Sequence, residues 1–277
     1  MSGAGAAEPG PTALVTGAGG GIGRALVARL LAAGWRVAVS DLSLEALAPL
    51  TGPEERLLRL TLDVRHVEGW RATLAAVEAR WGTPDVLYNV AGYLRPGRVW
   101  ELDPLDVERH LDVNVRGVML GTRVVGEAMR RGGRGHVVNV ASLAGLAPIP
   151  GLALYSASKY AVRAFSLAAA QELRPTGVAV TVVCPDAVET PMLALQLEYE
   201  EAALTFSGAR ALGADEVARA LTGRVLRRRP LELWLPASRG WLARAADLFP
   251  RLGLLLRGSM ERRGLRRQRA VKAGRGA

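Results

Sequence analysis

The chain has 277 residues, of which 49% are hydrophobic and 22% charged, as in globular proteins that bury an ample core. Its net charge of +10 is concentrated at one end: residues 251–277 hold nine Arg and Lys against one Glu, a local charge of +8 that leaves about +2 for the rest of the chain. The nearly neutral body and the lack of a recognised binding motif argue against a nucleic-acid partner.

Cysteine content and the N-terminal segment narrow the class further. The single cysteine, Cys184, excludes an intramolecular disulfide and a thiolate zinc cluster, which favours a reducing cytoplasm. Its place in the apolar run 180–184 predicts a buried structural thiol. Residues 1–11 are small residues, Gly and Pro without a basic patch before an apolar run, so we expect a flexible tail and not a secretory signal.

From Thr12 to Pro236, short β-branched runs alternate with longer stretches in which apolar residues recur at three- and four-residue spacing. This alternation is typical of βαβ units, which build a doubly wound parallel sheet in an α/β fold. Ligands of such sheets bind beyond the carboxyl ends of the strands. The expected strands are Ala13–Thr16, Val37–Ser40, Leu57–Leu62, Val86–Asn89, His136–Val140, Val178–Val183 and Glu232–Leu235. The expected helices include Ile22–Ala33, Val67–Trp81, Asp106–Arg131 and Leu154–Leu173.

A glycine-rich segment follows the first expected strand. It reads Thr16-Gly17-Ala18-Gly19-Gly20-Gly21-Ile22-Gly23, and a helix is expected to begin near Arg24. Glycines there let the backbone approach a pyrophosphate, whose charge the amides of the helix N-terminus can solvate. A tight turn without a ligand is the alternative, but the placement between a strand and a helix favours dinucleotide binding.

Acidic residues follow the second and third expected strands. Asp41 comes 18 residues after Gly23, where a carboxylate can accept hydrogen bonds from a ribose diol and repel a 2′-phosphate. This favours NAD over NADP, with Arg24 the one basic side chain expected nearby; the alternative is that Asp41 caps a helix beginning at Ser43. Asp63, with Val64 after it, is expected either to bond the adenine or to cap the next helix.

The expected chemical groups lie after the fifth strand. Ser142 ends the run Asn139-Val140-Ala141-Ser142, and Tyr155-Ser156-Ala157-Ser158-Lys159 begins 13 residues later. Helical residues four apart share a face, so the Lys159 ammonium can lie near the Tyr155 hydroxyl. We expect that cation, reinforced by an oxidised nicotinamide, to bring the pKa of Tyr155 down towards the working pH, as a general acid/base requires. Ser142 can then hold the substrate oxygen.

Over roughly Thr12 to Pro236 the chain resembles the short-chain dehydrogenase/reductase (SDR) family. Its glycine segment is similar to that family's glycine motif, and Asn89-Val90-Ala91-Gly92 to its Asn-Asn-Ala-Gly turn. Ser142, Tyr155 and Lys159 match the family's catalytic residues, and Asn114 matches the asparagine of its tetrad. The resemblance implies a Rossmann-type single domain and an oxidoreductase that interconverts a secondary alcohol and a ketone.

The resemblance also implies roles for single residues. Asn114 would bend its long helix around a water that links Lys159 to solvent, and Lys159 would bind the nicotinamide ribose. Thr190 would contact the nicotinamide carboxamide. The expected catalytic set is Ser142, Tyr155, Lys159 and Asn114. The expected cofactor-binding set is Gly17, Gly21, Ile22, Gly23, Asp41, Asp63, Val64, Asn89, Ala91, Gly92, Tyr155, Lys159, Pro185, Val188 and Thr190.

Two positions depart from the family pattern. Val90 replaces the second asparagine of the turn, which removes polar contacts but leaves Asn89, expected to face the cofactor, and Gly92. Asp186 stands where most members have glycine after Pro185, next to the nicotinamide. That carboxylate either alters the preference for cofactor or substrate or points into solvent.

Other functions and substrates stay open. A non-catalytic NAD-binding sensor or scaffold would need the glycine loop but not the pair Tyr155 and Lys159. The segment Ala187–Leu212 lies where the family places a mobile lid, and its apolar content favours a lipophilic substrate: a steroid, a fatty acyl ketone or a small secondary alcohol. Residues 184–186 and the tail are similar to those of 3-ketosphinganine reductases, although Asp41 departs from the NADPH preference that these imply.

Partners are expected from the remaining segments. The resemblance implies a homodimer or homotetramer, paired through the helices Asp106–Arg131 and Leu154–Leu173. The three histidines, His66, His110 and His136, lack partners at metal-ligand spacing, so we interpret them as surface or capping residues and expect no metal.

Residues 237–277 form an amphipathic and basic C-terminal extension, with Pro250 expected to break or kink any helix. Its segment Trp241–Arg269 is expected to contact anionic or apolar lipid surfaces, or else to cover the substrate mouth or pack on protein. The apolar stripe is Trp241, Ala245, Leu248, Leu252 and Leu255, and the cationic flank is Arg262, Arg263, Arg266, Arg267 and Arg269.

Overall fold

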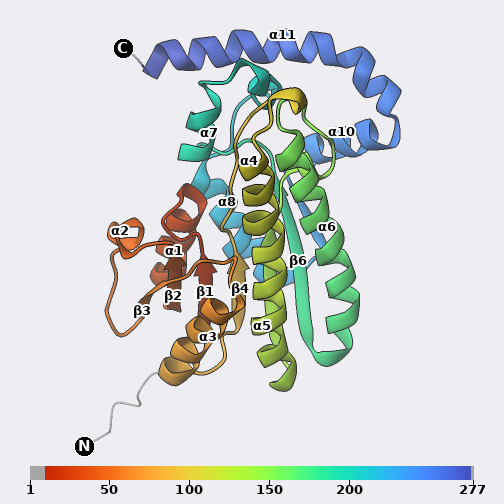
Figure 1. The fold of residues 1–277 in the computed structure, drawn as a ribbon. Coiled ribbons are helices and arrows are strands. Elements are labelled where there is room, and N and C mark those ends of the chain that lie inside the picture. Colours follow the sequence, from red (N-terminus) through yellow and green to blue (C-terminus); the bar gives the residue numbers. More distant parts are fainter. Residues whose placement is uncertain (1–9, 276–277) are drawn as a thin grey trace, which may run out of the picture.

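Seven parallel strands form one sheet in the order β3-β2-β1-β4-β5-β6-β7 in the computed structural model, which describes residues 10–275 apart from the side chains of 252, 253, 256 and 275 (Figure 1). This confirms the predicted doubly wound sheet. The strands are β1 Thr12–Thr16, β2 Arg36–Asp41, β3 Leu57–Thr61, β4 Val86–Asn89, β5 Gly135–Val140, β6 Val178–Pro185 and β7 Glu232–Leu235. The expected flexible tail falls almost entirely on residues outside this description.

Helices cover both faces of the sheet. On one face pack α1 and α8, followed by a π-helical turn, η6; on the other pack α3, α5 and α6. Their bounds are α1 Gly21–Ala32, α3 Val67–Trp81, α5 Gly117–Arg131, α6 Ala153–Leu173, α8 Ala214–Ala220 and η6 Leu221–Val225. The central strands β1 and β5 are buried along their whole length, because a sheet covered on both faces has no solvent side.

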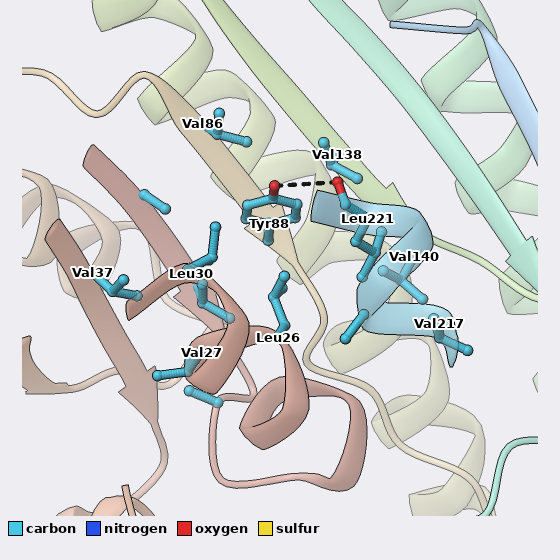
Figure 2. Close-up of a cluster of buried hydrophobic side chains, with 14 of the residues drawn as sticks. Leu26, Val27, Leu30, Val37, Val86, Tyr88, Val138, Val140, Val217 and Leu221 are labelled. Carbon is cyan, nitrogen blue, oxygen red and sulfur yellow. Dashed lines mark hydrogen bonds between the residues drawn. The ribbon is translucent and has the colours of Figure 1, made fainter. Parts of the chain in front are cut away.

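Figure 2 shows the core between the sheet and its first helical layer. Leu26, Val27 and Leu30 of α1 pack against strand residues of β2, β4 and β5. Tyr88 of β4 is fully buried there, and its hydroxyl donates a hydrogen bond of 3.5 Å to the carbonyl oxygen of Leu221 (Figure 2). The polar tip of this tyrosine is therefore satisfied by backbone within an otherwise apolar cluster.

The strand order reverses between β1 and β4. The chain moves from β1 outward to β2 and β3, then returns to β4 on the opposite side of β1. Helices that follow β1 and β4 lie on opposite faces, so a crevice opens at the carboxyl ends of these two strands. Shorter elements surround this end: α2 Leu44–Leu47, α4 Pro104–Arg109, α7 Pro191–Gln196 and two 3₁₀ segments, η3 Leu143–Gly145 and η5 Glu200–Ser207.

Two helices follow the last strand. These are α10, Ala237–Leu248, and α11, Pro250–Arg275, which lies across the carboxyl-end side of the molecule above α7 (Figure 1). The break between them falls at Pro250, as predicted, because proline lacks the amide that a continuous helix would use but suits a first helical position. None of the described helices is both long enough and apolar enough to cross a bilayer.

Candidate active site

A cavity of about 810 Å³ lies at the carboxyl ends of the strands. Residues that follow β1, β2, β4, β5 and β6 all line it, together with the segment after β6. Of the expected site residues, it is lined by Gly17, Gly21, Ile22, Gly23, Asp41, Asp63, Val64, Ala91, Gly92, Ser142, Tyr155, Lys159, Pro185, Val188 and Thr190. Asn89 and Asn114 lie behind its wall.

The glycine segment forms a cradle that side chains would fill. Gly17 has a φ of +62°, and a Cβ atom there would lie 2.6 Å from the Cα of Ala91. A Cβ on Gly23 would lie 2.3 Å from the carbonyl oxygen of Gly17. The first turn of α1 carries no acidic residue. Its free amides therefore face the cavity without a competing carboxylate, which suits the pyrophosphate of a dinucleotide.

Asp41 joins the end of β2 to this cradle. Its carboxylate accepts hydrogen bonds from the backbone amides of Gly19, at 2.9 Å, and Leu42, at 2.8 Å. The helix-cap alternative is wrong, because the side chain that caps α2 is Ser43, which accepts from the amide of Ala46. Two backbone amides therefore fix the orientation of this carboxylate at the cavity wall.

Asp63 is bound by an arginine that the sequence did not single out. Arg65 donates to both carboxylate oxygens, its Nη2 lying 2.7 Å from Oδ2, and it also lines the cavity. The hydrogen bond from Arg65 is the main reason why the pKa of Asp63 is lowered. The expectation of Arg24 as the one basic group near Asp41 therefore needs correction. The cap alternative for Asp63 is also wrong, because α3 begins at Val67 with His66 at its N-cap.

Ser142, Tyr155 and Lys159 meet on the other side of the cavity. The Lys159 ammonium lies 5.5 Å from the centre of the Tyr155 ring and donates to the carbonyl oxygen of Val140 at 2.9 Å. Lys159 is only 4% exposed, and the described part of the chain gives it no carboxylate partner in an ion pair. The Ser142 hydroxyl accepts from the amide of Ala144 at 3.1 Å, which fixes it at the start of η3.

The pKa of Tyr155 moves in the direction opposite to the prediction. Burial raises the pKa of Tyr155 to about 12, and a hydrogen bond with Ser142 offsets only part of that rise. Burial also lowers the pKa of Lys159 to about 8, because an ammonium loses its hydration there. The prediction considered the attraction between the two groups and neglected the desolvation of both.

Asn114 lies in a π-helical segment, in which each turn holds about one residue more than in an α-helix. The run from α4 into α5 passes through a π-helical segment, His110–Arg116. Asn114 accepts from the amide of Tyr93 at 2.7 Å, and donates to the Tyr93 carbonyl oxygen and to the Ser158 hydroxyl, both at 2.9 Å. Its Oδ1 lies 3.5 Å, and the Lys159 Nζ 3.8 Å, from the position that a Cβ on Gly92 would take. The Asn114 amide oxygen and the Lys159 ammonium therefore both lie within 4 Å of this position at Gly92.

Asn89 does not face the cavity, so the expectation that it contacts the cofactor is corrected. It is 2% exposed, and its amide donates to the Asn139 side chain at 2.8 Å. Asn139 in turn donates to the hydroxyl of Ser166. Strand alternation turns Asn89 towards the α5 and α6 layer, where it joins a buried polar chain that ties β4 to β5.

Thr190 closes the cavity against the glycine cradle. A Cβ on Gly21 would lie 2.6 Å from the Cγ2 of Thr190, and the Thr190 hydroxyl donates to the carbonyl oxygen of Val188 at 3.1 Å. Pro185 and Val188 line the wall between Thr190 and Ser142. The segment after β6 therefore approaches the first turn of α1.

Asp186 neither points into solvent nor stands alone. Arg239 of α10 donates to its carboxylate at 2.8 Å, and both side chains line the cavity. Their side chains are 27% and 14% exposed for Arg239 and Asp186. Sequence reasoning missed Arg239 because 53 residues separate it from its partner. The departure from glycine after Pro185 thus introduces an ion pair that fixes the C-terminal extension to the site.

We expect Asp186→Ala to lower the free energy of unfolding by about 1–3 kcal/mol, because it leaves the Arg239 guanidinium unpaired at a largely buried position. Denaturant unfolding measures the loss. The matched control is Arg71→Ala, which removes an ion pair of side chains that are 58% and 74% exposed and should cost under about 0.5 kcal/mol. Equal stability of Asp186→Ala and the unchanged protein would contradict the structural role of this pair.

Two of the three histidines are buried, which corrects their interpretation as surface or capping residues. His110 accepts from the amide of Arg95 at 3.3 Å and lies edge-on to the Tyr93 ring, whereas His136 lies 2.9 Å from the Thr181 hydroxyl. Burial lowers the pKa of His136 to about 4. Only His66, exposed at the N-cap of α3, fits the prediction. No group of three metal-ligating side chains occurs within residues 10–275.

Cys184 is buried and unpaired, as predicted. Burial raises the pKa of its thiol to about 12, so it carries no thiolate at neutral pH.

A family model, curated proteins and solved structures that are similar to this chain all point to one class of protein. The family model described as short chain dehydrogenase matches residues 11–201. The chain is 37% identical to 2-(R)-hydroxypropyl-CoM dehydrogenase of Xanthobacter autotrophicus over 68% of this chain and 79% of that one. It is 39% identical to 3-beta-hydroxysteroid dehydrogenase of Comamonas testosteroni over 68% and 75%. A short chain dehydrogenase/reductase from Burkholderia phymatum in complex with NAD superposes with a TM-score of 0.78 at 27% identity, over 88% of this chain and 95% of that one.

Proposed function

We propose, from the premise that this chain belongs to the short-chain dehydrogenase family, that it interconverts a lipophilic secondary alcohol and its ketone with NAD(H), using Tyr155 as the general acid/base. That it is a nicotinamide-dependent oxidoreductase acting on CH–OH groups follows from the family and its named relatives. The observation that carries the proposal is the single cavity whose opposite walls hold the glycine cradle with Asp41 and the group of Ser142, Tyr155 and Lys159.

The residues of this cavity fit a dinucleotide. Gly17 and Gly23 leave backbone uncovered where any Cβ would collide, and α1 presents free amides to the same space. Asp41 would hold the adenosine ribose, Lys159 the nicotinamide ribose and Thr190 the carboxamide. The bound nicotinamide would supply or accept the hydride at the substrate carbon. The Asp41 carboxylate supports NAD over NADP, because it would repel a 2′-phosphate.

The protein side of the reaction is the movement of one proton. In reduction, the Tyr155 hydroxyl donates its proton to the oxygen that develops from the ketone; in oxidation, the tyrosinate takes the proton from the alcohol. Ser142 orients the same oxygen through its hydroxyl. The Lys159 ammonium stabilises the tyrosinate, and the Asn114 amide beside it supports a water-borne route for the proton to solvent. General acid/base catalysis of this kind contributes about 10²–10⁴-fold.

The substrate end of the cavity is lined mostly by apolar side chains. Near Tyr155, an apolar cluster contains Leu94, Leu152, Ile149 and Met192, and these four residues also line the cavity. An alcohol or ketone with an apolar body would bury surface there, whereas a small polar one would leave these groups in contact with water. The named activity of the relative from Comamonas testosteroni supports a lipophilic substrate class.

A non-catalytic sensor is the competing function. It would require only the cradle and Asp41, and nothing in dinucleotide binding alone requires a buried, unpaired lysine beside a tyrosine. Burying an ammonium without a carboxylate is costly, so its retention supports a chemical role.

A homo-oligomer forms part of the proposal. The run from α4 to α5 carries exposed apolar side chains, Leu105, Leu111 and Met119, which are 54%, 49% and 37% exposed. Such side chains on a helix that the family pairs across a two-fold axis support a dimer or tetramer. Light scattering of the purified protein tests this part independently of activity.

A substrate panel tests the proposed function. Secondary alcohols and ketones of increasing apolar size are assayed with NAD(H) and NADP(H) side by side, and kcat/KM is compared. We expect kcat/KM to rise with apolar size and to be higher with NAD(H). Bound NADH without turnover on any member, while a related dehydrogenase is active on the same panel, would favour the sensor.

The pH dependence should differ between the two directions. Reduction needs the protonated hydroxyl of Tyr155, whose pKa burial raises, so kcat/KM should be flat from pH 6 to about 7.5 and fall above about pH 8, where Lys159 loses its charge. Oxidation needs the tyrosinate, so its kcat/KM should rise by up to tenfold per pH unit over the lower part of that range. Initial rates in both directions measure these profiles. An oxidation rate that falls between pH 6 and 8 would contradict the role of Tyr155.

A further inference from the structure

Helices α10 and α11, residues 237–275, form an arm that extends beyond the region matched by the family model, residues 11–201. The arm leaves the end of β7, turns at Pro250 and passes over the segment that contains α7 and η5 (Figure 1). That segment supplies Met192, Gln196 and Thr205 to the cavity. The arm is therefore packed on the wall of the site, as one of the expected alternatives had it.

Specific contacts fix one side of α11 against the protein. Gln268 donates to the carbonyl oxygens of Gln196 and Tyr199, both at 2.8 Å. A Cβ on Gly264 would lie 2.1 Å from the carbonyl oxygen of Ala203, so the helix backbone touches η5 directly. Gly264 and Gln268 are four residues apart and mark the docked side of α11.

The opposite side of α11 is cationic. Arg262 and Arg266 follow Leu255 by seven and eleven residues, so the three side chains share one face, and all three are exposed. Among the described residues, neither Arg262 nor Arg266 has a carboxylate partner, whereas Arg269 pairs with Glu200 at 2.9 Å. The expected cationic flank is thus reduced: Arg269 is paired and Arg267 is partly buried.

Large apolar side chains are exposed along α10, at the turn and at the start of α11, which precedes the cationic residues along the same helix. Six of them lie within residues 241–255, and each is at least 47% exposed. From α10 these are Trp241, Leu242 and Leu248; from the turn and the start of α11 they are Phe249, Leu254 and Leu255. Of the expected apolar stripe, Trp241, Ala245, Leu248 and Leu255 are exposed, whereas the side chain of Leu252 lies outside the described residues.

We propose that this turn and the adjoining face of α11 bind the surface of an anionic lipid bilayer. Apolar side chains beside arginines match the two layers of a bilayer interface, acyl chains and charged headgroups. The charge and the exposed apolar side chains favour a bilayer over a second copy of the chain or a nucleic acid as the partner of this surface. A second copy of the chain would bring two segments of like charge together, since residues 251–277 carry +8, and a nucleic acid would leave six apolar side chains without apolar contact. The proposal does not depend on which substrate the enzyme turns over.

Co-sedimentation of the full chain with vesicles tests the proposal. Vesicles of phosphatidylcholine alone are compared with vesicles containing about one third phosphatidylglycerol, at about 0.05 M and about 0.5 M salt. We expect partition into the anionic vesicles at low salt to exceed partition into neutral ones at least about tenfold, and to fall at high salt. Protein that remains in the supernatant with anionic vesicles at low salt would overturn the proposal.

Surface variants locate the binding face without removing the docked arm. Arg262→Ser with Arg266→Ser should weaken binding about 25-fold, at about fivefold for each arginine near an anionic surface. Leu254→Ser with Leu255→Ser should weaken it and leave the salt dependence unchanged. The matched control is Arg224→Ser with Arg228→Ser. It removes two exposed arginines that lie outside the arm, at and beside α9, Leu226–Arg228.

Two outcomes would count against the proposed face. A loss in the Arg224 and Arg228 control equal to that in the arm variants would mean that binding follows total charge only. A change of oligomeric state by light scattering in the Leu254 and Leu255 variant, with vesicle binding intact, would assign the apolar group to a second copy of the chain. NADH binding and circular dichroism confirm that each variant is folded.

Discussion

Tyr155→Phe is expected to lower kcat by about 10²–10⁴-fold while leaving NADH affinity within a few-fold of the unchanged protein. In the proposed mechanism the Tyr155 hydroxyl exchanges a proton with the substrate oxygen, whereas phenylalanine retains the ring and the cavity shape. Because the pKa of Tyr155 is raised to about 12, the unchanged enzyme holds this proton at neutral pH and can donate it. Steady-state rates and isothermal titration with NADH measure the two quantities separately.

Two further variants make this test specific. Lys159→Ala should lower both turnover and NADH affinity, because Lys159 supports the tyrosine and would also bind the nicotinamide ribose. Tyr160→Phe is the matched control: its hydroxyl donates to the carbonyl oxygen of Leu146 and to Asp247, and it does not line the cavity. Tyr160→Phe should retain most of the activity. A Tyr155→Phe enzyme that keeps more than about a tenth of the rate would contradict the assignment.

Local pattern was enough to predict the sheet. Every predicted strand lies within two residues of the observed one, because strands buried on both faces are β-branched runs bounded by turn residues. Asp41, Ser142 and Lys159 were also found from local information, since each lies at the end of a strand or at helical spacing from a partner. The prediction of their shared cavity needed only the rule that parallel strands present their carboxyl ends to one edge.

Long-range contacts explain what the sequence did not reveal. Arg239 and Asp186 meet because α10 folds back over the end of β6, and no local pattern records that return. Burial of His110 and His136 depends on which helix packs over them, which residue type alone does not decide.

The predicted direction of the pKa shift of Tyr155 was wrong for a related reason. Helical spacing gave the neighbour, Lys159, but not the depth of the pair in the protein. Desolvation depends on every atom around the hydroxyl, and it is the largest cause of the raised pKa of Tyr155, which the hydrogen bond with Ser142 only partly offsets. The same burial raises the pKa of Tyr155 to about 12 and lowers that of Lys159 to about 8, so it favours the neutral form of both groups.

Asp41→Ala is expected to shift the ratio of NADH to NADPH affinity towards NADPH by about 10–100-fold, which corresponds to about 1.4–2.8 kcal/mol. Asp41 would both accept hydrogen bonds from the ribose diol and repel a 2′-phosphate. Its removal should therefore weaken the binding of NADH and strengthen the binding of NADPH. Arg65 lines this end of the cavity, and Arg24 donates through its Nε to the carbonyl oxygen of Gly19, whose amide binds Asp41, so both can then meet the phosphate. Isothermal titration with both cofactors measures the ratio.

Asp41→Asn separates charge from anchoring in this experiment. An asparagine oxygen can still accept from the amide of Gly19 or of Leu42, the two donors that Asp41 now binds, but it carries no charge to repel a phosphate. If repulsion sets the preference, Asp41→Asn should gain NADPH affinity about as much as Asp41→Ala while keeping more of its NADH affinity. If Asp41 mainly anchors the glycine cradle, Asp41→Ala should weaken both cofactors and Asp41→Asn neither. Tighter binding of NADPH than of NADH by the unchanged protein would refute the proposed role of Asp41, because a fixed carboxylate at the ribose would disfavour the cofactor that carries a 2′-phosphate.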